Sequence, residues 1–182
     1  MTTWPPPFVP VFPAGHGPLA SDFDTWWFEN ASFLQNRVVF RAAQTTTATT
    51  LPDSGAVTTI GYDDVLEDPY SGWDSGTFEW GPPSGYSGWY QVTVTLRTAN
   101  VADLVDLRAG LTGEFTGQLT CVQGQSVTST TSGVCATFGL YLTGGQDSVG
   151  GAGQILNSGA AAETSLTAGQ NSTLEIIWVS QS

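Results

Sequence analysis

The chain lacks lysine altogether and has one histidine, two cysteines and few charges of either sign. Charged residues make up only 11% of its 182 residues, and 16 Asp and Glu outweigh four arginines, which gives a formal net charge of −12. A surface this acidic repels phosphate backbones, so we exclude nucleic-acid binding. Without lysine, the chain can neither form a Schiff base nor complete a Gly-rich phosphate loop, which excludes nucleotide enzymes.

The scarcity of histidine excludes most nucleophilic catalysis. A catalytic triad needs a histidine or another base beside the nucleophile. The single histidine, His16, lies among glycine and proline in the segment Ala14-Gly15-His16-Gly17-Pro18, where we expect a turn residue. The glycines from 144 to 153 follow no dinucleotide-binding pattern either. We therefore predict that the protein is not an enzyme and needs no cofactor.

Export signals and membrane segments are also missing from the sequence. The first residues have no basic start and no unbroken apolar stretch, so we expect no signal peptide and synthesis in a host cytoplasm. No segment has the length and hydropathy of a membrane span. The two cysteines, Cys121 and Cys135, have no histidine partners for a zinc site. They form either a hairpin disulfide or two buried free thiols, and the sequence leaves both open.

The first 36 residues differ from the rest of the chain. Residues 1 to about 20 hold most of the prolines, which predicts an extended arm, and Ser21 with Asp24 begins a helix that ends near Asn36. Aromatic residues recur along both, so we expect residues 1–36 to anchor the protein to other proteins, although packing of the helix on its own domain is an equal alternative. The predicted anchoring residues are Trp4, Phe8, Phe12, Phe23, Trp26 and Trp27.

Residues 37–182 form the second predicted domain, and their pattern indicates antiparallel β-structure. Short runs of alternating large and polar residues are separated by Gly, Ser and Thr turns, which favours a β-sandwich. The predicted strands are 37–42, 57–62, 78–80 and 89–97 (these two as a pair), 104–111, 118–122, 134–142, 154–156 and 171–179. We expect loops at Thr45–Thr50 (or a strand edge), at the Ser/Thr-rich tip 123–133 and at the glycine-rich segment 144–153.

A dense group of carboxylates lies in a turn-rich segment before the central strands. It consists of Asp63, Asp64, Glu67, Asp68 and Asp74. We expect a solvated loop, because Pro69 and the glycines let the carboxylates move apart. A calcium site is the alternative, since calcium takes six to eight oxygens from flexible loops, although the spacing is not that of an EF-hand. A pair of catalytic carboxylates acting on a sugar is the third interpretation.

Seven tryptophans are present, and their positions suggest different roles. Trp89 and Trp178 lie in predicted strands, so we expect them in the core or between subunits. Trp73 lies in a turn and is the candidate for stacking on a host-surface glycan, although packing over a neighbouring strand is the interpretation we favour.

The central segment resembles the C1q/TNF-like jelly-roll domains. These read aspartate, a gap, Gly-x-Phe, a Pro turn and then Gly-x-Tyr leading a β-branched strand. The matching residues are Asp74, Gly76, Phe78, Pro82, Pro83, Gly88, Tyr90, Val92 and Val94. The resemblance covers roughly residues 37–182 and implies an all-β antiparallel jelly-roll sandwich that assembles as a homotrimer, with Trp89, Tyr90 and the final strand supplying contact area.

The opening of the chain resembles the start of minor tail or fibre-like virion proteins of actinobacterial phages. The residues that carry this resemblance are Trp4-Pro5, Phe8-Val9-Pro10, Leu19-Ala20-Ser21-Asp22-Phe23 and Arg37-Val38-Val39-Phe40-Arg41-Ala42. It implies a phage virion structural protein: a trimeric minor tail, baseplate or fibre component that binds other virion proteins through its arm and contacts the host surface. The alternatives are a capsid decoration or head-fibre protein, and a carbohydrate-binding module or carbohydrate-active enzyme.

Overall fold

The structure is a computed structural model that describes residues 38–99, 105–115, 123–127, 131–156 and 159–181. This part of the chain contains thirteen β-strands and no α-helix. Nothing helical in it has the length and hydropathy needed to cross a bilayer. The predicted arm and helix of residues 1–36 lie outside the described residues, as does the predicted strand 118–122.

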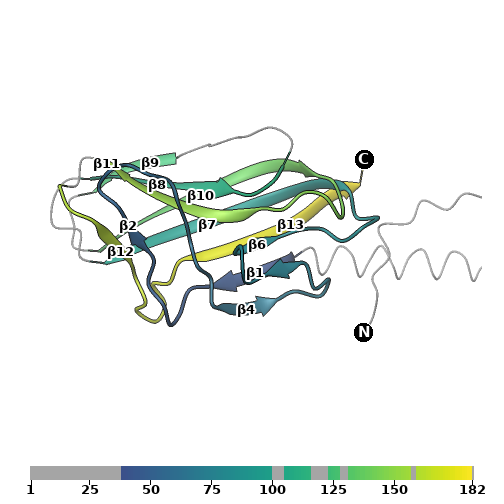
Figure 1. Ribbon diagram of the computed structural model, residues 1–182, viewed down its shortest axis with the longest axis horizontal. Coiled ribbons are helices and arrows are strands. Elements are labelled where there is room, and N and C mark those ends of the chain that lie inside the picture. Colours follow the sequence, from purple (N-terminus) through teal and green to yellow (C-terminus); the bar gives the residue numbers. More distant parts are fainter. Residues whose placement is uncertain (1–37, 100–104, 116–122, 128–130, 157–158, 182) are drawn as a thin grey trace, which may run out of the picture.

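Two antiparallel sheets form the sandwich (Figure 1). The larger one, sheet A, has the order β2-β12-β7-β13-β1-β4, with β10 also paired to β7. Its strands are β1 (Val38–Ala43), β2 (Thr50–Leu51), β4 (Asp64–Glu67), β7 (Gly88–Ala99), β10 (Thr131–Leu142), β12 (Ala162–Thr164) and β13 (Thr173–Gln181). The smaller one, sheet B, has the order β3-β11-β8-β9. Its strands are β3 (Thr58–Thr59), β8 (Val105–Thr112), β9 (Gln123–Val127) and β11 (Gly150–Leu156).

The core lies between these sheets because every second residue of the long strands is apolar. In β7, alternate residues from Tyr90 to Leu96 are at most 1% exposed, and in β13 Leu174, Ile176 and Trp178 are equally buried. Leu107 of β8 and Ile155 of β11 close the core from sheet B and are fully buried. Burying one face of each sheet in this way is the main stabilising contribution of a β-sandwich. The prediction of an all-β antiparallel jelly-roll sandwich is therefore confirmed.

Most of the predicted strands are present with small shifts at their ends. The runs predicted at 37–42, 89–97, 104–111, 134–142 and 171–179 correspond to β1, β7, β8, β10 and β13. The predicted strand 57–62 is shorter, since only Thr58–Thr59 pairs in a sheet. The predicted pairing of 78–80 with 89–97 is wrong: β6 (Glu79–Trp80) pairs with β5 (Trp73–Asp74) in a separate two-stranded sheet, whereas β7 pairs with β10, β12 and β13.

The prediction of a glycine-rich loop over 144–153 is wrong for its second half. Strand β11 begins at Gly150 and crosses the sandwich next to β8. Its glycines permit close packing rather than flexibility, because a Cβ on Gly151 would lie 2.1 Å from the Tyr62 hydroxyl oxygen. A strand that must pass this close to a buried ring needs glycine, which gives it the composition of a loop.

Two further segments predicted as loops are strands. The segment 123–133 contains β9 and the start of β10. The acidic segment contains β4, which pairs with β1, and β5. An edge strand with no buried side chain has no hydrophobic alternation, so the period-two signal that identified the central strands is missing from β4.

Candidate assembly surface

The strict alternation of β7 leaves one side of sheet A facing outward. Because Tyr90 and Val92 point into the core, Trp89, Gln91 and Thr93 must lie on the opposite face. Trp89 is half exposed, at 50%, whereas Tyr90 is only 1% exposed. The expectation that Tyr90 supplies contact area between subunits is therefore wrong, because Tyr90 belongs to the core. Trp89 is free to contact another molecule.

Strand β10 matches β7 residue for residue over its full length and extends this outward surface. Twelve consecutive pairs run from Thr131 opposite Ala99 to Leu142 opposite Gly88, without a bulge. Tyr141 is thereby placed opposite Trp89, and the two rings form an edge-to-face pair with centroids 5.9 Å apart and planes at 74°. Tyr141 is 36% exposed. This pair is a large apolar feature on the outside of a sheet whose other face is the core.

Strands β13 and β1 continue the apolar surface across the sheet. A register shift between Trp178 and Ser180 leaves Val179 49% exposed beside this end of β7. Ile177 of β13 pairs with Val38 of β1 and is only partly buried. We name the outward side of β1, β13, β7 and β10 the outer face. We name its apolar end the apolar belt, which consists of Trp89, Tyr141, Val179, Ile177 and Val38.

The rest of the outer face is polar but uncharged along its centre. The Thr93 and Thr137 hydroxyls are 3.1 Å apart in a hydrogen bond, and the Thr95 hydroxyl donates to the Cys135 sulfur at 3.6 Å. Cys135 carries a free thiol and is exposed, so it is neither part of a disulfide nor a buried thiol. Cys121 lies outside the described residues. A Cβ added to Gly139 would meet no atom within 4 Å. Small side chains therefore line this part of the face.

Acidic residues are absent from β7 and β10, the two neighbouring strands at one side of this face. The 24 residues of β7 and β10 contain one charged side chain, Arg97, although the chain as a whole carries 16 Asp and Glu. Carboxylates enter the face at its β4 side, where Arg41 donates to Glu175 at 3.0 Å and lies 3.7 Å from Glu67. The hydrogen bond to Glu175 is the main cause that raises the pKa of Arg41, so this ion-pair group keeps its charge.

The carboxylates of the acidic segment are held apart from one another. The Asp63 carboxylate accepts five hydrogen bonds, from the backbone and hydroxyl groups of Thr45 and Thr46 and from the backbone N–H of Thr47, at 2.6 to 2.8 Å. Partial burial raises the pKa of Asp63, but the hydrogen bonds from Thr46 and Thr45 outweigh it, so this pKa lies well below its usual range. The carboxylate therefore stabilises the threonine turn before β2.

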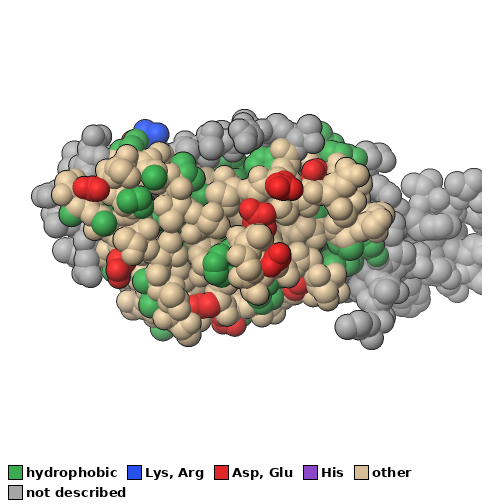
Figure 2. Space-filling model, in the orientation of Figure 1, with side chains coloured by type: hydrophobic (Ala, Val, Ile, Leu, Met, Phe, Trp, Pro, Cys, Tyr) green, Lys and Arg blue, Asp and Glu red, His purple; other side chains and the backbone are tan. Residues whose placement is uncertain are grey.

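The other carboxylates have separate surroundings. Asp68 accepts hydrogen bonds from the backbone N–H of Gly72 and Trp73 and from the Trp80 indole, and Asp74 accepts one from the Gly76 N–H. Asp64 begins β4 and is exposed. In the described part of the chain no three His, Cys, Asp or Glu residues are grouped so as to hold a metal ion. Figure 2 shows acidic side chains scattered over the displayed face. The calcium site stays a prediction.

Trp73 packs against its own domain. Its ring stacks on Phe40 with centroids 4.9 Å apart and planes at 19°, and it lies near Tyr62 and Phe78 at 6.4 Å. It is partly buried against the core. Packing over a neighbouring strand, the interpretation favoured for Trp73, describes its position, while glycan contact at this residue stays a prediction.

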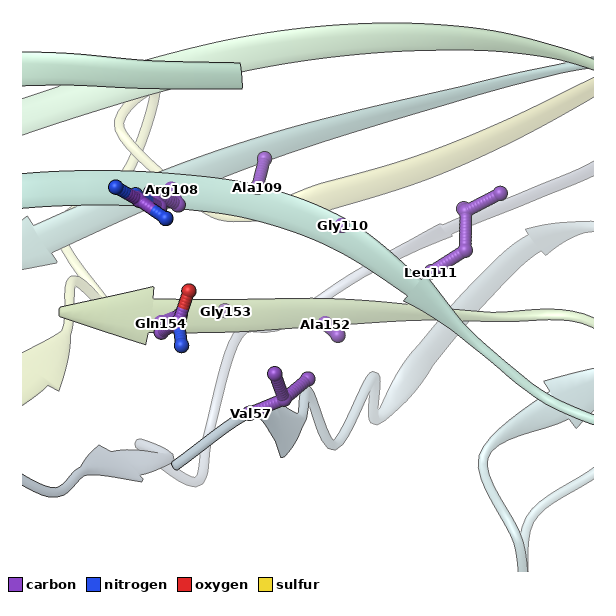
Figure 3. Close-up of a pocket in the computed structure, with 8 residues that line it drawn as sticks. All are labelled: Val57, Arg108, Ala109, Gly110, Leu111, Ala152, Gly153 and Gln154. Carbon is purple, nitrogen blue, oxygen red and sulfur yellow. The ribbon is translucent and has the colours of Figure 1, made fainter. Parts of the chain in front are cut away.

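A small hollow on the outside of sheet B is too narrow for an organic ligand. Arg108 and Gln154 face each other there on β8 and β11 (Figure 3), with Val57 and Ala152 among the other lining residues. The space open to the centre of a water molecule is about 10 Å³, which holds at most one water. Arg108 donates to Asp106 at 3.0 Å and is thus already paired. The hollow therefore offers no site for a sugar or a nucleotide.

The sequence pattern could have identified part of this surface. The alternation in β10 places Val134, Ala136 and Leu140 inward, so Tyr141 is assigned outward by parity alone. Val179 could not be found in this way, because the bulge in β13 interrupts the alternation that begins at Leu174. The register that brings Tyr141 to Trp89 depends on the strand pairing and is not readable from either segment alone.

Comparisons with known proteins identify the fold. No protein-family model matches the chain, and no curated protein matches it. Among solved structures, murine APRIL at pH 5.0 is similar, with a TM-score of 0.51 and 14% identity over 78% of this chain and 98% of that one. PRD1 vertex protein P5 is similar with a TM-score of 0.50 and 16% identity over 79% and 97%. The described part of the chain therefore has the jelly-roll fold of TNF-like proteins.

Proposed function

We propose that the protein is a structural component of a phage virion and that it assembles as a homotrimer through the outer face. The observation that carries this proposal is the apolar belt, with Trp89 and Tyr141 exposed on strands that contain no carboxylate. Exposed aromatic residues that cluster on an uncharged surface are characteristic of protein interfaces. Self-association fits this position, because the repulsion between copies with a net charge of −12 is weakest where their contact surfaces carry no carboxylates.

Three copies are the number that the fold favours. A copy that covers the belt with a different surface makes a heterologous contact, and such contacts form a ring when the rotation between copies closes. The resemblance to C1q/TNF-like domains implies a threefold ring. A ring also removes sheet edges from solvent, which a monomer leaves available for aggregation.

The virion role is supported by two independent likenesses. The fold is similar to that of PRD1 vertex protein P5, a phage vertex protein. The opening of the chain resembles phage minor tail and fibre-like proteins. Within this role, we propose that residues 1–36 bind another virion protein and that loops of the jelly roll contact the host surface, as in a minor tail, baseplate or fibre component.

The oligomer is tested by replacing one residue of the belt. Trp89→Arg places a charge in the interface while the exposed position leaves the core intact, so we expect the mass in solution to fall from three chains to one. Leu66→Arg is the control, because Leu66 is 53% exposed on β4 and lies outside the belt; it is expected to remain trimeric. A trimer that survives Trp89→Arg contradicts this use of the face.

A capsid decoration or head-fibre protein is the second candidate within virions. In this role the arm would bind the capsid lattice, and the uncharged face would join the copies of the protein. The two roles differ in copy number, since tail parts occur in few copies per particle and decoration proteins in hundreds. Densitometry of purified virions separates them, and a low copy number supports the tail or fibre role.

A further inference from the structure

Arg97 differs from the other arginines of the described chain in having no carboxylate partner. Arg41 lies in the ion pairs at the β4 side of the outer face, and Arg108 pairs with Asp106. No such ion pair joins Arg97 to any carboxylate of the described residues, although the chain has 16 Asp and Glu against four arginines. In so acidic a protein, a surface arginine without a local partner points to a carboxylate of another molecule.

The Arg97 side chain leans across β10 over a glycine. Gly133 of β10 lies opposite Arg97 in the ladder with β7. A Cβ on Gly133 would lie 2.5 Å from Arg97 Cδ and 2.7 Å from Nη1, so the arginine occupies the space that another side chain would fill. Arg97 is nevertheless exposed. Its guanidinium is therefore oriented before any partner binds, and an oriented guanidinium loses less conformational entropy when it pairs with a carboxylate.

Glu163 carries an exposed carboxylate on the other side of β7, at the same end of that strand. It belongs to β12, where Glu163 lies opposite Ala99 and Thr164 lies opposite Thr98. Thr164 and Thr98 are buried, so Glu163 must point to the outward side of sheet A, as Arg97 does. Glu163 forms no ion pair within the described residues. The two opposite charges thus lie at the same level along the strands, and Arg97 leans away from Glu163 over β10.

We propose that Arg97 of one copy forms an ion pair with Glu163 of the next copy. This inference rests on the proposed homotrimer and names a polar contact of the same interface. A second copy is the partner that the arrangement favours, because each copy has a cation that leans to one side of β7 and a carboxylate on the other side. In a ring whose axis runs along the strands, two residues meet across a contact only when they lie at the same level, and these two residues do.

The ion pair also offsets the cost of covering a charge. An arginine on a face that another copy covers loses part of its hydration, and a buried charge without a partner is strongly destabilising. A carboxylate from the neighbouring copy supplies the opposite charge that this part of β7 and β10 lacks. The pair also fixes the alignment of the copies along the strands, whereas the apolar contacts of the belt are not directional.

Exchanging the two charges tests the pair. Arg97→Glu and Glu163→Arg each bring two like charges together, so each should raise the concentration at which the trimer half-dissociates at least about tenfold. The double variant restores opposite charges and should return to within about threefold of the native chain. Analytical ultracentrifugation at low salt over a concentration series measures this. Both positions are exposed, so the near-ultraviolet circular dichroism of the fold should be unchanged in all variants.

The matched control combines Arg97→Glu with Glu114→Arg. It has the same net charge as the double exchange, but Glu114 is exposed in the loop after β8 and lies outside sheet A. We expect this control to stay as weakly associated as Arg97→Glu alone, because its new arginine does not meet the carboxylates at the contact.

The outcomes separate this inference from the proposed function. A native trimer whose dissociation is unchanged by either single variant overturns the ion pair and leaves the trimer standing. Single variants that weaken the trimer without recovery in the double exchange, or with equal recovery in the control, overturn the pairing of Arg97 with Glu163. A native chain that is monomeric overturns both.

Discussion

At the scale of single residues, two glycines of the sandwich have opposite roles although they look alike in the sequence. Gly151 lies in the core-facing part of β11, where a Cβ would lie 2.1 Å from the Tyr62 hydroxyl oxygen. Gly139 lies on the outer face, where a Cβ would meet nothing within 4 Å. We expect Gly151→Ala to lower the free energy of unfolding by about 1–3 kcal/mol through overpacking. Gly139→Ala is the matched control and is expected to change it by less than about 0.5 kcal/mol. Urea denaturation measures both, and equal effects would contradict the packing described here.

The Asp63 carboxylate gives a pH dependence whose sign follows from its hydrogen bonds. Because its pKa is lowered in the folded protein, the stability it contributes is present above the unfolded pKa of about 3.9 and is lost as the pH falls below it. We expect Asp63→Asn to lower the melting temperature at pH 7 and the difference from the native chain to shrink below about pH 4. Melting curves from pH 7 to pH 2 check this, with Asp64→Asn as the control. A difference that stays constant with pH would argue against an ionised cap on the threonine turn.

At the scale of elements, the hairpin of β5 and β6 contains a bulky residue in a left-handed conformation. Phe78 has φ of 59°, and its ring packs near Trp73 and over Gly61. We expect Phe78→Gly to be less destabilising than Phe78→Ala by about 1 kcal/mol, because both lose the ring and only glycine removes the backbone strain. Chemical denaturation of the two variants measures the difference. A glycine variant less stable than the alanine variant would show that the backbone is not strained there.

The sequence identified elements whose residues alternate and missed elements held by other forces. Strands β7 and β13 were readable because Val92, Val94, Leu174 and Ile176 repeat at period two. Of strand β11 only 154–156 was predicted, and its first part was missed because its packing requires glycine at Gly151, whereas β4 was missed because it has no buried face. Only part of the candidate surface was predicted from the sequence. Trp89 was expected in the core or between subunits, whereas its pairing with Tyr141 depends on the register of β10 with β7.

At the scale of the whole molecule, the arm and the jelly roll are proposed to have separate tasks. Removing residues 1–36 should leave a soluble domain, because the buried core described above lies entirely within residues 39–178. We expect this truncated protein to keep the oligomeric state of the full chain and to be absent from purified particles. Complementation of a phage that lacks the gene, followed by immunoblotting of the virions, measures incorporation. Normal incorporation would place the docking surface on the jelly roll.

The central claim is that the neutral outer face joins three copies of the chain. Size-exclusion chromatography with multi-angle light scattering on the full chain at micromolar concentration tests it most directly. The expected result is a single species with three times the 19.1 kDa mass of one chain, which Trp89→Arg converts to a species of one chain. A native protein that elutes stably at the mass of one chain would contradict the account.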